Sequence, residues 1–216
     1  MRYLQTALLL LISASLVACG GGTEQAAVAQ PGVTAVVDQP PAVTAAAETI
    51  TLSGTGATVT EAVTLPWSAA RVICSHNGRR NFVVTAHQDG TESLLVNVIG
   101  KYQSIRPLFG AGEVYFAIDA DGDWTVTVEP LGQADGAPFA GSGPAVSGLF
   151  DAPASGPWAY SHDGSRNFVV RLHCGASSDL VVNEIGKVSG STVVSFAPEP
   201  CFWDVEGDGN WSLAPE

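Results

Sequence analysis

The sequence predicts an all-β protein built from two tandem antiparallel β-sandwich modules of jelly-roll type. Two observations favour this fold. Apolar β-branched and aromatic residues alternate with polar ones in short runs, and turn-forming residues separate the runs every six to twelve positions. Several strings of residues also recur later in the chain at a nearly constant offset. A small closed barrel is the alternative architecture for such strands.

The repeat defines the domain organisation. SHNGRRNFVV at residues 75–84 returns as SHDGSRNFVV at 161–170, identical at eight of ten positions. LLVNVIGK and DGDW return in the same order as LVVNEIGK and DGNW, at offsets of 86 and 87 residues. This period is too long for a solenoid turn and fits a small domain. We therefore expect module 1 at residues 48–130, a linker at 131–137 and module 2 at 138–216.

Module 1 is expected to contain about eight strands and no helix. The clearest strands are 71–76, 81–87, 93–99, 113–119 and 124–128, and weaker signals lie at 50–53, 59–65 and 104–109. The turn at 77–80 suggests a hairpin that places His76 opposite Asn81. His87 would then lie about 20 Å from His76, at 3.3 Å per residue, which excludes one metal site for both.

The two-residue period of a strand predicts which side chains face the core. The core candidates of module 1 are Phe82, Val84, Ala86, Val114, Phe116 and Ile118. Those of module 2 are Phe168, Val170, Leu172, Cys201, Trp203 and Val205. Trp124 and Trp211 each follow a glycine turn, and we expect them to cap the core of their modules.

The first eighteen residues have the pattern of an export signal, with Arg2, an apolar run and then small residues. Leu16-Val17-Ala18-Cys19 resembles the lipobox of bacterial lipoproteins, which implies that Cys19 is the lipid attachment site. An ordinary secretory signal with an incidental cysteine is the alternative. Residues 19–47 combine prolines, glycines and small residues without apolar periodicity, and we interpret them as a flexible tether. These features predict a protein anchored to a membrane on its non-cytoplasmic side.

The net charge of the chain limits the classes of partner that it can bind. Removal of residues 1–18 takes away one arginine. The remaining chain has 8 Lys and Arg and 21 Asp and Glu residues, which gives a net charge of −13. Such a surface repels phosphate backbones, which makes nucleic acid an unsuitable partner. We expect a soluble monomer apart from its anchor.

The motif string NFVV, LLVN.IGK and YF.ID.DGDW resembles an uncharacterised β-sandwich module of secreted bacterial proteins and lipoproteins. It is more distantly similar to pre-peptidase C-terminal domains, which are non-catalytic appendages of exported enzymes. The resemblance covers residues 48–216 in two copies. It implies a binding or spacing role and carries no catalytic residue.

Carboxylates form the main candidate for a metal site. Oxygen ligands clustered on a tight turn suit calcium, and such clusters recur in both modules. The candidate ligands are Asp119, Asp121, Asp123, Glu206 and Asp208. The alternative is a plain acidic turn at a hairpin tip. No other cofactor is expected.

Cysteine and asparagine give two further predictions. Cys174 and Cys201 are expected on inward faces of module 2, where an exported protein can keep a disulfide, whereas Cys74 is expected to be a buried thiol. Asn97 and Asn183 occupy equivalent positions beside apolar strands. Such amides either bond the backbone or contact a ligand.

Catalysis is not expected. Ser75 and His76 adjoin in sequence, but neighbouring residues of a strand point to opposite faces and no nucleophile elbow is present. The sequence therefore favours a membrane-anchored, non-enzymatic binding or adhesion lipoprotein, with glycans as a candidate ligand. The alternative is an envelope scaffold that binds a protein partner.

Overall fold

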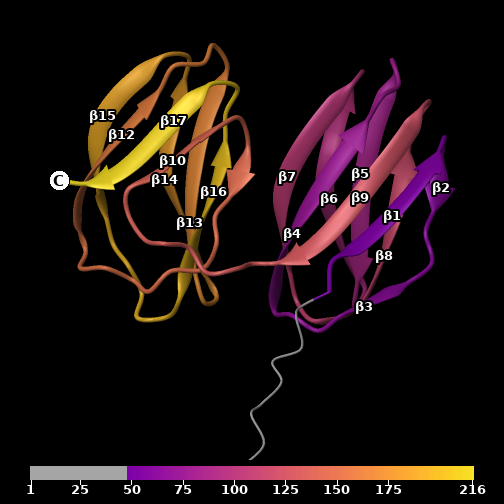
Figure 1. Cartoon of the computed structure of the whole chain (residues 1–216), viewed down its shortest axis with the longest axis horizontal. Coiled ribbons are helices and arrows are strands. Elements are labelled where there is room, and N and C mark those ends of the chain that lie inside the picture. Colours follow the sequence, from indigo (N-terminus) through magenta and orange to yellow (C-terminus); the bar gives the residue numbers. More distant parts are fainter. Residues whose placement is uncertain (1–47) are drawn as a thin grey trace, which may run out of the picture. The chain divides into compact units, whose positions relative to one another are not determined.

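The computed structural model describes residues 48–216 as an all-β fold (Figure 1). The predicted signal, the lipid attachment site Cys19 and the tether lie outside the described residues. Among the described residues there is no helix, and hence none long and apolar enough to cross a membrane. The strands form four-stranded and five-stranded antiparallel sheets, and none of these sheets closes into a barrel.

Module 1 contains nine strands: β1 (Ile50–Thr55), β2 (Thr58–Val59), β3 (Val63–Leu65), β4 (Ala69–His76), β5 (Asn81–Gln88), β6 (Thr91–Ile99), β7 (Tyr102–Phe109), β8 (Gly112–Asp119) and β9 (Asp123–Pro130). All strands expected from the sequence are present, most of them one to three residues longer. The run 59–65 is divided between β2 and β3. At the break, Thr60 bonds both backbone groups of Phe116, because its N–H donates to the carbonyl and its Oγ1 accepts from the N–H.

The sheet order is that of a jelly roll. One sheet of module 1 has the order β1-β9-β4-β7 and the other β2-β8-β5-β6, with β3 also pairing β8. Only the β5–β6 connection joins neighbouring strands of one sheet, through Asp89 and Gly90, both with positive φ. The hairpin expected at 77–80 is therefore wrong, and the acidic turn at 120–122 is not a hairpin tip. Both segments are arches that cross from one sheet to the other, since Gly, Asn and Asp suit either kind of turn.

Module 2 repeats this order with eight strands: β10 (Phe139–Ser142), β11 (Ala145–Val146), β12 (Gly156–His162), β13 (Asn167–Cys174), β14 (Ser177–Ile185), β15 (Val188–Val194), β16 (Cys201–Glu206) and β17 (Asn210–Pro215). Its sheets are β10-β17-β12-β15 and β11-β16-β13-β14. No sheet contains strands of both modules, so each sandwich is built from one copy of the repeat.

Each sandwich has its own apolar core. The core residues predicted from the two-residue period are all buried in both modules. Trp124 and Trp211 are also buried, as predicted. Each indole N–H donates to the carbonyl of a repeated glycine with positive φ, Gly56 or Gly143, at 3.0 and 2.8 Å.

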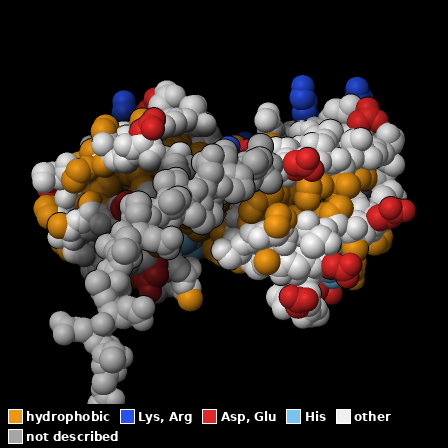
Figure 2. Space-filling view, turned by 60° about the horizontal axis from the view of Figure 1, so that its bottom comes forward, with side chains coloured by type: hydrophobic (Ala, Val, Ile, Leu, Met, Phe, Trp, Pro, Cys, Tyr) orange, Lys and Arg blue, Asp and Glu red, His pale blue; other side chains and the backbone are white. Residues whose placement is uncertain are grey.

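The surface is predominantly acidic. Figure 2 shows Asp and Glu side chains spread over the visible surface, with hydrophobic side chains between them and Lys or Arg side chains at its upper edge. Large apolar side chains that are exposed include Leu94 and Ile99 on β6 and their equivalents Leu180 and Ile185 on β14. Each pair lies on an edge strand of its sheet.

Candidate functional site

The residues with the strongest repeat signal meet at one end of each sandwich, which we call the arch end. In module 1 it consists of four connections: 56–57, 77–80, 100–101 and 120–122. Backbone hydrogen bonds tie them together, from Gly56 N to Gly122 O at 3.0 Å and from Gly100 N to Arg80 O at 2.8 Å. The equivalent bonds occur in module 2, so the arch end is a repeated structure.

Asp121 fastens the two arches of module 1 to each other. Its carboxylate accepts the backbone N–H groups of Arg79 and Arg80 at 3.0–3.1 Å, and its Oδ1 lies 3.3 Å from His76 Nε2. These hydrogen bonds, led by the one from Arg80, lower the pKa of Asp121. The carboxylate is therefore held in its charged form by the backbone of a neighbouring arch.

Asp208 has the same role in module 2. It accepts the backbone N–H groups of Ser165 and Arg166 and the Ser165 hydroxyl at 2.8–3.1 Å. The Arg166 N–H is the main reason why the pKa of Asp208 falls to about 2. His162 Nε2 lies 3.6 Å from its Oδ1.

The repeated histidines of the arch end are buried parts of the fold. His76 stacks on Phe82 and His162 on Phe168, each with ring centroids 4.6 Å apart. The Nδ1 of His76 lies 3.0 Å from the carbonyl oxygen of Gly100, and Nδ1 is the donor because a carbonyl oxygen only accepts. The Nε2 is thereby aimed at the arch aspartate rather than at solvent.

A second pair joins the arches by exchanging an amide and a carboxylate. In module 1, Asn77 Nδ2 donates to Asp123 at 2.9 Å, and the Asp123 N–H donates to Asn77 Oδ1 at 2.8 Å. In module 2 the pair is Asp163 and Asn210, with the corresponding distances 2.9 and 2.6 Å. The carboxylate belongs to the second residue of the pair in module 1 and to the first in module 2, but each pair contains one carboxylate and one amide.

Two equivalent surface pockets lie beside these pairs. The pocket of module 1 has a volume of about 360 Å³ and that of module 2 about 640 Å³. Their lining residues are equivalent at all nine positions, and Lys101 matches Lys187. The lining residues are Ser75, His76, Asn77, Lys101, Tyr102, Gln103, Asp123, Trp124 and Thr125 in module 1, and Ser161, His162, Asp163, Lys187, Val188, Ser189, Asn210, Trp211 and Ser212 in module 2.

The twin pockets place a few polar groups around a lining that is mostly apolar, with buried aromatic side chains at its base. His76 and Trp124 are buried, whereas Lys101, Gln103 and Asp123 are exposed. The pocket thus offers an ammonium group, an amide, a carboxylate and hydroxyl groups. Sequence reasoning missed this site because its three segments are far apart in the chain, although the recurrence of Lys101 as Lys187 was visible.

The five carboxylates considered for calcium do not come together. Asp121, Asp123 and Asp208 are engaged by backbone or side-chain donors, and Glu206 pairs with Arg106 at 3.0 Å. Asp119 ends β8 and belongs to a different sheet from Asp123. Within residues 48–216, no group of three or more His, Cys, Asp or Glu side chains is arranged to hold a metal ion. The turns are explained by hydrogen bonding within the protein.

Asn97 and Asn183 are exposed on the outer faces of β6 and β14. Both lie on the same face as an exposed leucine and an exposed isoleucine of their own strand. A β-bulge precedes them, because the register shifts between Val84 and Thr85 in module 1 and at the equivalent place in module 2. They are part of a surface outside the twin pockets.

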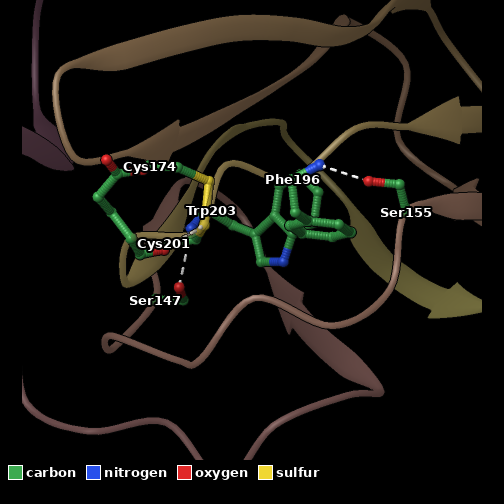
Figure 3. Close-up of a disulfide and its surroundings, with 7 residues drawn as sticks. Ser147, Ser155, Cys174, Phe196, Cys201 and Trp203 are labelled. Atoms are coloured by element: carbon green, nitrogen blue, oxygen red, sulfur yellow. Dashed lines mark hydrogen bonds between the residues drawn. A yellow bond between two sulfur atoms is a disulfide. The ribbon is translucent and has the colours of Figure 1, made fainter.

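The predicted disulfide joins Cys174 and Cys201, which are directly paired across β13 and β16 (Figure 3). It lies beside Trp203, whose backbone N–H donates to Ser147 Oγ at 2.9 Å. Cys74 is buried and unpaired, as predicted, and burial raises the pKa of its thiol to about 12.

No protein-family model and no curated protein matches the chain. The functional argument therefore rests on the residues themselves.

Proposed function

We propose that the protein is an exported lipoprotein, anchored to a membrane through Cys19, that binds glycans without transforming them. The observation that carries the binding role is the pair of equivalent pockets, one in each module. The Cys174–Cys201 disulfide is consistent with an oxidising compartment outside the cytoplasm. The resemblance of residues 16–19 to a lipobox supports the anchor.

Glycans fit the pockets better than other polar ligands because hydroxyl groups both donate and accept hydrogen bonds. Lys101 donates, Asp123 accepts, and Asn77 and Gln103 do both. Tyr102 adds an aromatic side chain to the first pocket, where module 2 has Val188. The two sites therefore differ in affinity, with the first the stronger. Two sites on one anchored chain bind a polymer with an avidity above that of either site.

The binding proposal is tested with the exported chain and a panel of envelope and plant polysaccharides, by isothermal titration calorimetry. We expect Lys101→Ala and Lys187→Ala each to remove one site, and the double variant to lose binding at least about tenfold. Arg166→Ala is the matched control, because its exposed side chain lines neither pocket. Absence of binding by the unaltered chain, or equal binding by all variants, would contradict the proposal.

The anchor is tested separately by feeding cells an alkyne-labelled fatty acid. We expect the label on the unaltered chain and none on Cys19→Ser, which should also leave the membrane fraction. Equal labelling of both chains would rule out Cys19 as the attachment site. This result does not depend on whether the pockets bind glycans.

A scaffold role with a protein partner is the second candidate function. It is favoured by an exposed apolar sheet face on module 1 that includes Val59 and Leu94, which are 66% and 62% exposed. In this case substitutions on that face would abolish function and the lysine variants would not.

A further inference from the structure

Within residues 48–216, nothing packs on the outer face of sheet β2-β8-β5-β6 in module 1, whereas the β11, β13 and β16 part of the equivalent face in module 2 is covered. We call the first the open face, defined by Val59, His87 and Tyr115, and the second the covered face, defined by their equivalents Val146, His173 and Phe202. Val59 is 66% exposed and Tyr115 40%, but Val146 and Phe202 are each only 4% exposed. The same surface of the repeat is thus used in one copy and unused in the other.

The aromatic pair at the centre of this surface is present in both copies. His87 stacks on Tyr115 with ring centroids 4.7 Å apart, and His173 stacks on Phe202 at 4.8 Å. Burial lowers the pKa of His173. The open face therefore has the side-chain arrangement of a contact surface, without the contact.

Residues of β4 and β7 in module 1 pack on the covered face. Phe109 at the end of β7 lies 5.1 Å from His173 and 5.9 Å from Phe202, between ring centroids. Ala69 and Ile105, on β4 and β7, pack against the cluster that contains Phe202. The surface that covers it is therefore the outer face of β4 and β7 in sheet β1-β9-β4-β7.

No other segment of residues 48–216 packs on the equivalent of this covering surface in module 2. This equivalent is the outer face of β12 and β15, and we call it the free face. Its outward residues are Pro157, Ala159, Ser161, Ser189, Ser191 and Val193. None is charged, although the chain has a net charge of −12, and Val193 is 75% exposed. Each chain thus has one unused copy of each half of a contact that it already makes internally.

We propose that the open face of module 1 binds the free face of module 2 in a second copy of this chain. The contact is heterologous, because the two surfaces differ, and each added chain presents a new open face. Repetition of this contact therefore extends the assembly beyond a dimer, into rings or open linear chains. The sequence alone predicted a monomer, because the repeat does not show which copy of a face is covered.

The contact between chains is weaker than the internal one. Ile105 and Phe109 have Ser191 and Ser195 as equivalents, so the free face offers less apolar surface. The open face in turn has Ala117 in place of the buried carboxylate of Asp204 and so has no charge to desolvate there. Association therefore depends strongly on protein concentration, and anchoring in a membrane would raise that concentration locally.

The test is sedimentation of the exported chain with Cys19→Ser, so that no lipid drives association. We expect the weight-average mass to rise with concentration beyond that of a dimer. Tyr115→Asp and Val193→Asp should each weaken association at least about tenfold, because a charge enters an apolar contact. Ser53→Asp, on an exposed position of β1 away from both faces, is the matched control.

Mixing the two weakened variants distinguishes this contact from other modes of association. The Tyr115→Asp chain keeps an intact free face and the Val193→Asp chain an intact open face. We therefore expect a 1:1 heterodimer that does not extend, although neither variant associates alone. Failure of the mixture to form a heterodimer would overturn the proposal.

A photo-crosslinking benzophenone side chain at position 115 gives an independent reading in intact cells. Crosslinks to residues 157–161 or 189–193 of a second copy would support the contact. Crosslinks only to another protein, or to residues 20–47 of the same chain, would overturn it, as would a constant monomer mass up to about 1 mM protein.

Discussion

The two modules agree at the arch end and differ at the opposite end. At the arch end, the buried histidine and the capping aspartate recur with the same partners, and their distances differ by no more than a few tenths of an ångström. At the opposite end, Gln88 of module 1 donates to the carbonyls of Gly110 and Ala111, whereas its equivalent Cys174 is bridged to Cys201.

The choice between a hydrogen bond and a disulfide corresponds to the length of the loop that each of them holds. In module 1 two residues, 110 and 111, join β7 to β8, and one amide side chain holds them. In module 2 six residues, 195–200, join β15 to β16, and a longer loop loses more entropy when ordered. A covalent bridge at the place of a hydrogen bond compensates for the longer loop.

The amide–carboxylate pair shows what the repeat retains. Asn77 and Asp123 in module 1 correspond to Asp163 and Asn210 in module 2, so both residues have changed. The backbone N–H bond keeps its direction, and the bond between the side chains is kept with donor and acceptor exchanged. One carboxylate and one amide are needed, because two carboxylates would repel and two amides would lose the charge-assisted bond.

Loss of the disulfide should cause the largest difference in stability between the two modules. Cys174→Val with Cys201→Val is expected to destabilise module 2 by about 3 kcal/mol, since the bridge closes a loop of 27 residues. Module 1 should be unchanged. Hydrogen–deuterium exchange, read separately for each module, measures both, and an equal loss of protection in the two modules would refute the assignment.

Substitution of the glycines that contact the tryptophans should cause the next largest loss of stability, and the loss should be similar in the two modules. A Cβ at Gly54 or Gly141 would lie 2.5 Å from the indole of Trp124 or Trp211. Gly54→Ala and Gly141→Ala are each expected to destabilise their own module by about 2 kcal/mol through overpacking. Gly156→Ala is the control, because a Cβ there meets nothing within 4 Å. Urea denaturation compares the three, and a harmless Gly54→Ala would contradict the packing argument.

Acid should weaken both modules through the arch aspartates. Their folded pKa values lie below the unfolded value, so the stability that they provide is complete above about pH 4. It is lost as pH falls toward the folded pKa, which is about 2 for Asp208. Asp121→Asn and Asp208→Asn should reduce this dependence in their own modules, as measured by urea midpoints from pH 6 to pH 2. An unaltered pH slope in both variants would show that other groups cause it.

Exchange of the amide and the carboxylate should have the smallest net effect. Asn77→Asp alone should lower the melting temperature of module 1, because two carboxylates then face each other. Addition of Asp123→Asn should restore it by reproducing the pair of module 2. A double-mutant cycle measures the coupling, and additive effects would mean that the pair is not a unit.

The strands and the core could be predicted because both follow from local period. Val84 and Ala86 on β5 alternate with the polar residues Thr85 and His87, and that two-residue period places them inward. The disulfide followed from the same alternation, since it put Cys174 and Cys201 on inward faces of an exported module.

Strand pairing and the site could not be predicted, because their determinants are distant in the chain. The arch at 77–80 has the residues of a hairpin, and only Asp121, more than forty positions later, shows that it crosses between sheets. The carboxylates looked like a metal site because their hydrogen-bond donors, such as the N–H of Arg80, carry no sequence signal. The open and covered faces differ in neighbours, which a repeat alignment does not contain.

The buried thiol of Cys74 bears on how the chain acquires its bridge. Thiol–disulfide exchange needs a thiolate, and a thiol with a pKa of about 12 inside a packed core supplies almost none at neutral pH. Once module 1 has folded, Cys74 cannot attack the Cys174–Cys201 bridge or compete for either partner. Cys74 therefore does not interfere with disulfide formation in module 2 once module 1 has folded. Mispairing with Cys74 is limited to the time before module 1 folds.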